Sequence, residues 1–282
     1  MTSPVSAPDG FFVVEADRYV PTRHSRGYWM PGSLNGAAVA SLLAAVLEQR
    51  HVEPGWIPVR FVVDLLGMAR DEPLEVSTRV VKSGGRLRLV EGEIVQGGQL
   101  VARASLQSLR ETEAPANPTW QSAPWSAPHP ETVAAASWSP AFEIRPLPPE
   151  AARVTRAPLP PGDAAQSNMP VLGPLAPIAN RQTWLTVRRT VIAGTPHTPF
   201  TRLATAADFA SPFSHSSETG IDYVNTDFTI YLHRLPVGEW LGFEMVGHSA
   251  RAGIGIGECW VHDEAGPLGT INVSALAQTR RG

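Results

Sequence analysis

The sequence contains few of the residues on which several protein classes depend. Cys259 is its only cysteine, which excludes disulfides within the chain and cysteine-rich zinc sites. Lys82 is its only lysine, so nearly all of the basic charge is carried by arginine. No apolar run reaches the ~18 residues that a transmembrane helix needs. The first ten residues lack the basic and apolar segments of a secretory signal, so we expect a soluble, cytoplasmic chain with no membrane partner.

Charge and motifs exclude further classes. The formal net charge of -3 argues against a protein that binds nucleic acid, and the eight histidines are scattered without the spacing of metal ligands. We therefore expect no nucleic-acid partner, no metal and no cofactor. No G-x-S-x-G motif is present, which argues against an α/β-hydrolase. The glycines at 253, 255 and 257 neither match G-x-G-x-x-G nor precede a predicted helix, so a Rossmann site is rejected.

The prolines divide the chain. More than half of the 27 prolines lie between residues 114 and 177, and proline disfavours both continuous helix and central strand. With 43% hydrophobic and 17% charged residues, the remainder is typical of globular domains. We predict an N-terminal domain over residues 1–113, a Pro/Ala-rich linker over 114–138 and a C-terminal domain over 139–282, with an irregular excursion that ends near 177.

An internal repeat relates the two domains. A shift of 167 residues superposes Phe61 on Phe228 and Val63 on Ile230, and the same shift aligns alanines of two predicted helices. One offset that holds across separate segments indicates a tandem duplication.

Each copy is predicted to contain one long helix followed by an antiparallel sheet, an α+β arrangement. Apolar spacing of 3.6 residues predicts the first helix over 34–50, with Ser33 or Asn35 as its N-cap. Its counterpart is expected over 202–214. Segments rich in β-branched residues, separated by glycine turns, predict the following strands: 11–14, 59–65, 74–81, 87–96, 100–110, 142–145, 184–189, 226–234, 241–249, 254–262 and 269–279.

Two segments carry a family resemblance. Residues 29–36 (WMPGSLNG) run into an alanine-rich helix, and residues 226–240 contain an aspartate strand that ends in His-Arg and is followed by Glu-Trp. Together with Asp208 on the second helix, they resemble the TesB-like (type II) acyl-CoA thioesterases over nearly the whole chain. The resemblance implies a tandem double hotdog fold, in which two long helices are each wrapped by an antiparallel β-sheet, and further association into dimers.

The resemblance also implies a site in the second copy. The family holds a water with aspartate, threonine and glutamine side chains, and hydrolyses the acyl-CoA thioester without a covalent intermediate. Asp208 matches the aspartate, Asn225 with neighbouring Thr226 falls at the threonine, and Ser274 replaces the glutamine. Gly36 is a candidate for the amide that binds the thioester carbonyl. The first copy has no carboxylate at the position equivalent to Asp208.

The sequence is compatible with more than one role for Arg234 and with more than one function for the protein. Arg234 lies on the outer end of a predicted strand, where it either pairs with acidic residues or binds the phosphates of CoA. Because Ser274 lacks the amide of glutamine, a non-catalytic acyl-CoA or acyl-chain binding protein is the main alternative to the enzyme. A structural hotdog whose groove is closed by aromatic side chains, and a hydratase, are weaker readings.

Overall fold

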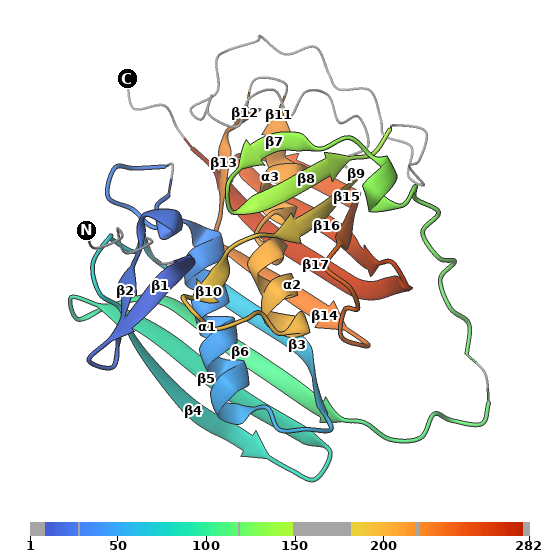
Figure 1. The fold of residues 1–282 in the computed structure, drawn as a ribbon, viewed down its shortest axis with the longest axis horizontal. Coiled ribbons are helices and arrows are strands. Elements are labelled where there is room, and N and C mark those ends of the chain that lie inside the picture. The colour runs from blue at the N-terminus through green and yellow to red at the C-terminus, as the bar shows by residue number, and fades with distance from the viewer. Residues whose placement is uncertain (1–8, 28, 118, 149–181, 218–219, 279–282) are drawn as a thin grey trace, which may run out of the picture.

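The computed structural model describes residues 9–27, 29–117, 119–148, 182–217 and 220–278 (Figure 1). The irregular excursion predicted to end near 177 lies largely outside these residues. Among the described residues, no helix combines the length and apolar composition that crossing a bilayer would need.

One large sheet crosses the molecule. Its strand order is β4-β5-β6-β3-β14-β17-β16-β15-β9-β8-β7, with β13 also paired to β17, and every pairing is antiparallel. The strands are β3 (Trp56–Leu65), β4 (Glu75–Ser83), β5 (Leu87–Gln96), β6 (Gln99–Arg110), β7 (Ala136–Ser139), β8 (Phe142–Pro146), β9 (Gln182–Val187), β13 (Tyr223–Asn225), β14 (Asp227–Leu232), β15 (Leu241–Arg251), β16 (Ile254–Asp263) and β17 (Gly266–Ala277).

The strand order repeats on the two sides of the sheet centre. Outward from the β3–β14 pair, it is β3-β6-β5-β4 in one direction and β14-β17-β16-β15 in the other. At the centre Phe61 pairs with Ile230 and Val63 with Phe228, and Phe61 and Phe228 are equivalent by the 167-residue shift. This mirrored order supports the duplication that the sequence indicates, and it joins the two copies in one continuous sheet.

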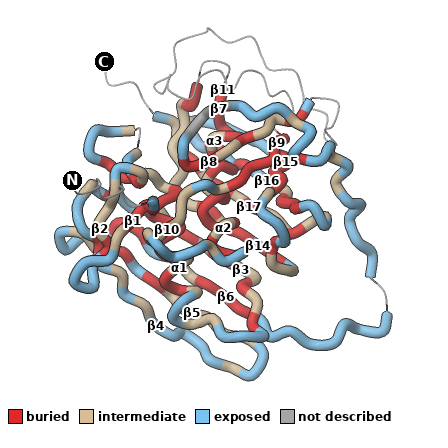
Figure 2. Tube along the Cα trace, viewed as in Figure 1, coloured by how far each residue is buried: buried red, intermediate tan, exposed pale blue. Residues whose placement is uncertain are grey.

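The first helix, α1 (Gly36–His51), forms as expected. Its N-cap is Asn35, one of the two predicted candidates, whose side-chain oxygen accepts a hydrogen bond from the Ala37 amide at 2.7 Å. The helix contacts β5 and β6 of the sheet and also the second helical segment, so ten of its residues are buried (Figure 2). Its burial on several sides explains the alanine-rich composition, since small side chains allow close approach.

The second helix departs from the prediction of one continuous helix over 202–214. It is divided into α2 (Pro199–Ala207) and α3 (Ala210–His215), with Asp208 and Phe209 between them. Pro212 explains the division, because a proline cannot donate to the carbonyl four residues earlier and its ring clashes with that group. That carbonyl belongs to Asp208, and it accepts from the Ser211 amide at 3.1 Å instead.

The remaining elements lie outside the large sheet. The strand predicted over 11–14 was expected to complete the first copy. It is instead β1 (Gly10–Glu15), which pairs with β2 (Arg18–Pro21) and, in parallel, with β10 (Thr190–Ile192). The first copy is thereby also joined to the segment preceding α2. Four short elements complete the fold: η1 (Arg23–Ser25), η2 (Pro130–Thr132), β11 (Ser216–Ser217) and β12 (Gly220–Ile221).

Candidate active site

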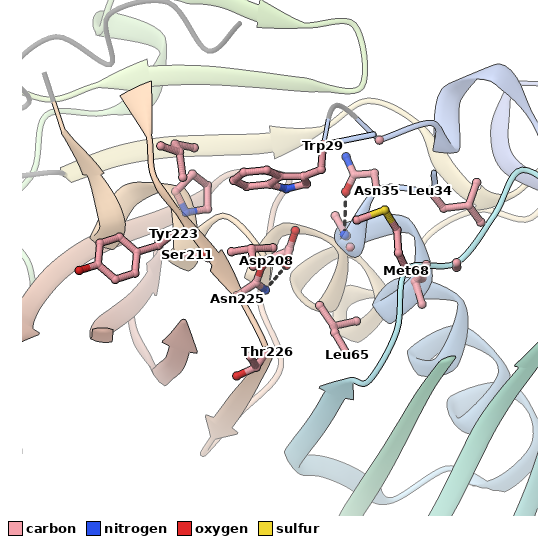
Figure 3. Close-up of a pocket in the computed structure, with 18 of the residues that line it drawn as sticks. Trp29, Leu34, Asn35, Leu65, Met68, Asp208, Ser211, Tyr223, Asn225 and Thr226 are labelled. Carbon is pink, nitrogen blue, oxygen red and sulfur yellow. Dashed lines mark hydrogen bonds between the residues drawn. The ribbon is translucent and has the colours of Figure 1, made fainter. Parts of the chain in front are cut away.

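A cavity of about 450 Å³ lies between the two copies, where the start of α1 meets the end of α2 (Figure 3). The first copy contributes the loop before α1, the first turn of α1 and residues 65–69, which begin at the last residue of β3. The second copy contributes residues from several elements: Phe142, Asp208, Phe209, Ser211, Pro212, Ile221, residues 223–226 and Leu276. Most of the lining is apolar, so its few polar groups are held in surroundings with little water. This open cavity argues against the reading in which aromatic side chains close the groove.

The N-terminus of α1 faces Asp208. A Cβ built at Gly36 would lie 3.3 Å from each carboxylate oxygen of Asp208 and 3.3 Å from Cδ1 of Leu65. The first amides of a helix have no acceptor within the helix, and the helix dipole adds partial positive charge there. The two copies therefore complete one site, with helix amides from the first and the carboxylate from the second.

Burial and hydrogen bonds define the state of Asp208. Its carboxylate lies in the break between α2 and α3, where Oδ1 accepts from Asn225 Nδ2 at 2.8 Å. Burial raises the pKa of Asp208 above its ordinary value, and the hydrogen bonds from Asn225 and from the Ala37 amide act in the opposite direction. A carboxylate whose pKa is raised by an apolar pocket is suited to accept a proton from a bound water.

The other two predicted polar residues form a separate cluster. Thr226 lies at the bend between β13 and β14, and its hydroxyl is 2.9 Å from that of Ser274 on β17. Both residues contact Asp227 Oδ1, which accepts from the Ser274 amide at 3.0 Å and from the Ser274 hydroxyl. Thr226 lines the cavity together with Asn225, whereas Ser274 is absent from its lining. The structure thus brings Asn225 to Asp208 and directs Ser274 to Asp227.

Arg234 lies apart from the cavity lining. Its guanidinium donates to both carboxylate oxygens of Asp263, at 2.6 and 2.7 Å, and to the carbonyl of Gly266 at 3.1 Å. Burial alone would raise the pKa of Asp263, but the bonds from Arg234 and from the amides of Val237 and Ala265 hold it below its usual value. Of the two roles considered for Arg234, this geometry favours the acid pair.

Sequence reasoning missed several residues of the site. Asp227 was seen only as part of a strand, although it binds Thr226 and Ser274. Trp29 entered only as part of the helix-entry motif, yet it lines the cavity above Asp208 in the view of Figure 3. Its position immediately before a glycine-containing helix entry is the signal that could have marked it. No group of three or more potential metal ligands occurs among the described residues.

Solved structures share this architecture. The chain matches an acyl-CoA thioesterase II, TesB2, from Mycobacterium marinum with a TM-score of 0.59 and 17% identity, over 95% of this chain and 96% of the other. It matches a protein of unknown function with a hot dog fold from Alicyclobacillus acidocaldarius with a TM-score of 0.64 and 14% identity, over 96% and 97% of the two chains. A tesB protein from Mycobacterium avium subs. paratuberculosis gives 0.61 and 13%, over 94% of each. These likenesses establish a hotdog fold.

Family models identify the family of the chain, which the structural likenesses alone do not. The acyl-CoA thioesterase N-terminal domain matches residues 25–107, and the acyl-CoA thioesterase C-terminal domain matches residues 119–276. No curated protein sequence matches the chain. The fold and site define a hotdog protein whose two copies share one largely apolar cavity that contains a few polar groups. The chain belongs to the acyl-CoA thioesterase family, which makes it a thioester hydrolase and confirms the resemblance seen in the sequence.

Proposed function

We propose that this protein hydrolyses an acyl-CoA thioester to the free acid and CoA, with Asp208 as the general base. The observation that carries the proposal is the position of the Asp208 carboxylate between the first turn of α1 and the amide of Asn225, inside an apolar cavity. A water molecule and a carbonyl group have polar partners there and few elsewhere along the lining.

The hydrogen bonds that Asp208 and Asn225 can form suggest the role of each in the reaction. Asn225 donates through Nδ2 to Asp208. The side-chain oxygen of Asn225, Oδ1, can therefore accept one hydrogen bond from a water. Asp208 accepts the other proton as the water oxygen bonds to the thioester carbon. The carbonyl oxygen becomes an oxyanion, which the first amides of α1 at Gly36 stabilise. When the tetrahedral intermediate collapses, the carbon–sulfur bond breaks and Asp208 returns its proton to the departing thiolate.

Thr226 and Ser274 have supporting roles in this proposal. Thr226 borders the cavity next to Asn225, and its backbone amide donates to the carbonyl of Ser274 at 3.0 Å. The hydroxyl pair and Asp227 fix the bend that aims Asn225 at Asp208. Ser274 therefore acts through the backbone rather than on water, which is consistent with its replacing a longer glutamine.

The test is release of free CoA, followed with a thiol reagent, for acyl-CoAs of short, medium and long chains and for aryl-CoAs. We expect Asp208→Asn to abolish turnover while retaining binding of the substrate, because asparagine keeps an acceptor for Asn225. Asn225→Ala is expected to lower kcat by roughly 10²-fold, since it removes a partner of both the base and the water. Ser274→Ala, the matched hydroxyl control outside the cavity lining, should lower kcat by less than about tenfold.

Two outcomes contradict the proposal differently. Unchanged turnover in Asp208→Asn keeps the thioesterase and discards this site. If the unsubstituted protein binds acyl-CoA without turnover, the protein is a binding protein. The absence of Ser274 from the cavity lining would then explain the lack of catalysis.

A further inference from the structure

The residues that line the cavity differ in exposure. Leu66, Met68 and Leu276 are 53%, 41% and 49% exposed, whereas Phe142 and Phe209 are 4% and 6% exposed. We take the exposed residues 66–68 as the open end of the cavity, through which a ligand enters with its apolar part toward the buried lining. If the thioester lies at Asp208, the CoA portion leaves the cavity past the exposed end.

Arg70 is held at this exposed end by its backbone. Its amide donates to Gln96 Oε1 at 2.7 Å, and its carbonyl accepts from Gln96 Nε2 at 3.0 Å. It also forms a β-bridge with Ser33, and the Leu34 amide donates to the carbonyl of Ala69 at 2.8 Å. Leu34 and Ala69 both line the cavity, so the position of Arg70 relative to the entrance is fixed.

The charge of Arg70 is not neutralised locally. Its side chain is exposed, and its Nη1 lies 3.4 Å from Sδ of Met30, the neighbour of the cavity residue Trp29. No carboxylate among the described residues forms an ion pair with it. Arg26, the chain neighbour of the cavity residue Gly27, differs because its Nε binds Asp71 at 2.8 Å. Arg70 thus offers a positioned cation with donors available to a ligand.

We infer that Arg70 binds a phosphate group of the CoA moiety as it leaves the cavity. This inference rests on the proposed function. Guanidinium groups bind phosphate oxygens through two parallel hydrogen bonds, and Arg70 is the cation closest in the chain to the exposed lining. Ala69, the chain neighbour of Arg70, is hydrogen-bonded to Leu34, two residues before Gly36, so Arg70 lies near the helix entry that is proposed to bind the oxyanion.

The test compares substrates that share an acyl group but differ in their phosphates: octanoyl-CoA, octanoyl-dephospho-CoA and octanoyl-N-acetylcysteamine. We expect Arg70→Ala to raise KM for octanoyl-CoA roughly three- to tenfold with kcat unchanged, the range of one partly exposed charged contact. The N-acetylcysteamine thioester, which has no phosphate, should keep its kcat/KM. Arg70→Lys should recover part of the loss. An effect that persists with dephospho-CoA assigns Arg70 to the diphosphate, and one that disappears assigns it to the 3′-phosphate.

Two arginines serve as controls. Arg86→Ala removes an exposed cation in the turn between β4 and β5, at the end of the sheet opposite to Leu65, and should change nothing. Arg251 is the second control, because it lies near another exposed residue of the cavity lining. It pairs with Ile254 on β16, which in turn pairs with the lining residue Leu276 on β17. A KM effect in Arg251→Ala with none in Arg70→Ala overturns the inference, as does an equal effect of Arg70→Ala on both kinds of thioester.

Failure of the proposed function is recognised separately. If no thioester is hydrolysed, binding of CoA itself is measured by calorimetry. Weaker CoA binding in Arg70→Ala then keeps the phosphate site and discards the reaction, and equal binding discards the phosphate site.

Discussion

Substitution of Gly36 by alanine is expected to lower kcat/KM with little effect on the stability of the fold. The added Cβ would lie 3.3 Å from both oxygens of Asp208 and from Cδ1 of Leu65, closer than ordinary contact. Leu65 can rotate away, but Asp208 is tied to Asn225 and must shift by a few tenths of an ångström. A misplacement of ~1 Å costs about 10²-fold in rate, so we expect kcat/KM to fall roughly tenfold.

Stability should move little in the same variant. Alanine is favoured over glycine within a helix by ~1 kcal/mol, less at its first residue, and the crowding at the cavity offsets part of that gain. The free energy of unfolding, measured by denaturant titration, is therefore expected to stay within about 0.5 kcal/mol of the parent. Gly85→Ala, at a glycine with no neighbour within 4 Å of its added Cβ, is the control for the added methyl group and should leave kcat/KM unchanged. Unchanged kcat/KM in Gly36→Ala would refute the close approach of α1 to the reacting groups.

Four further predictions follow from individual residues. Because burial raises the pKa of Asp208, kcat/KM should fall as pH drops through a value above the ordinary aspartate range; a profile flat from pH 5 to 9 contradicts this. The raised pKa also means that ionised Asp208 costs stability, which declines as pH rises through that pKa, so Asp208→Asn should not lower Tm. Arg234→Ala leaves the fully buried Asp263 carboxylate without its guanidinium partner, so it should lower the free energy of unfolding by about 2–4 kcal/mol. The KM for acyl-CoA should not change in the folded protein. A rise in KM would instead indicate that Arg234 binds the substrate. In Gly242→Ala the new methyl overlaps the Trp125 ring, which should cost about 1–3 kcal/mol, and a double-mutant cycle with Trp125→Ala that shows no coupling would disprove the contact.

Local pattern was sufficient for most of the fold. Segments rich in β-branched residues and bounded by glycine turns located most strands of the large sheet to within a few residues. The short strands β7 and β13 were not predicted. The cap of α1 was narrowed to Ser33 or Asn35 because few side chains satisfy a helix N-terminus, and Asn35 is the cap found. The 167-residue shift anticipated a doubled architecture, which the mirrored strand order supports. The domain boundaries at 113 and 138, the dimer and the cytoplasmic location remain predictions.

Tertiary structure decided how the site is assembled. The resemblance assigned Asp208, Asn225, Thr226 and Ser274 to one group. In the structure the cross-strand partner of Asn225 is Ala275, and Ser274, one residue earlier on β17, points to the opposite face. Ser274 therefore binds Asp227, while Asn225 binds Asp208. Nothing local to Gly36 reveals that its helix begins against a carboxylate 172 positions later, because that contact depends on the packing of α1 against α2. Residue types and spacing therefore indicated the family, and the resemblance pointed to Asp208 as the proposed reacting carboxylate. Only the packing of one copy on the other determined which groups surround it.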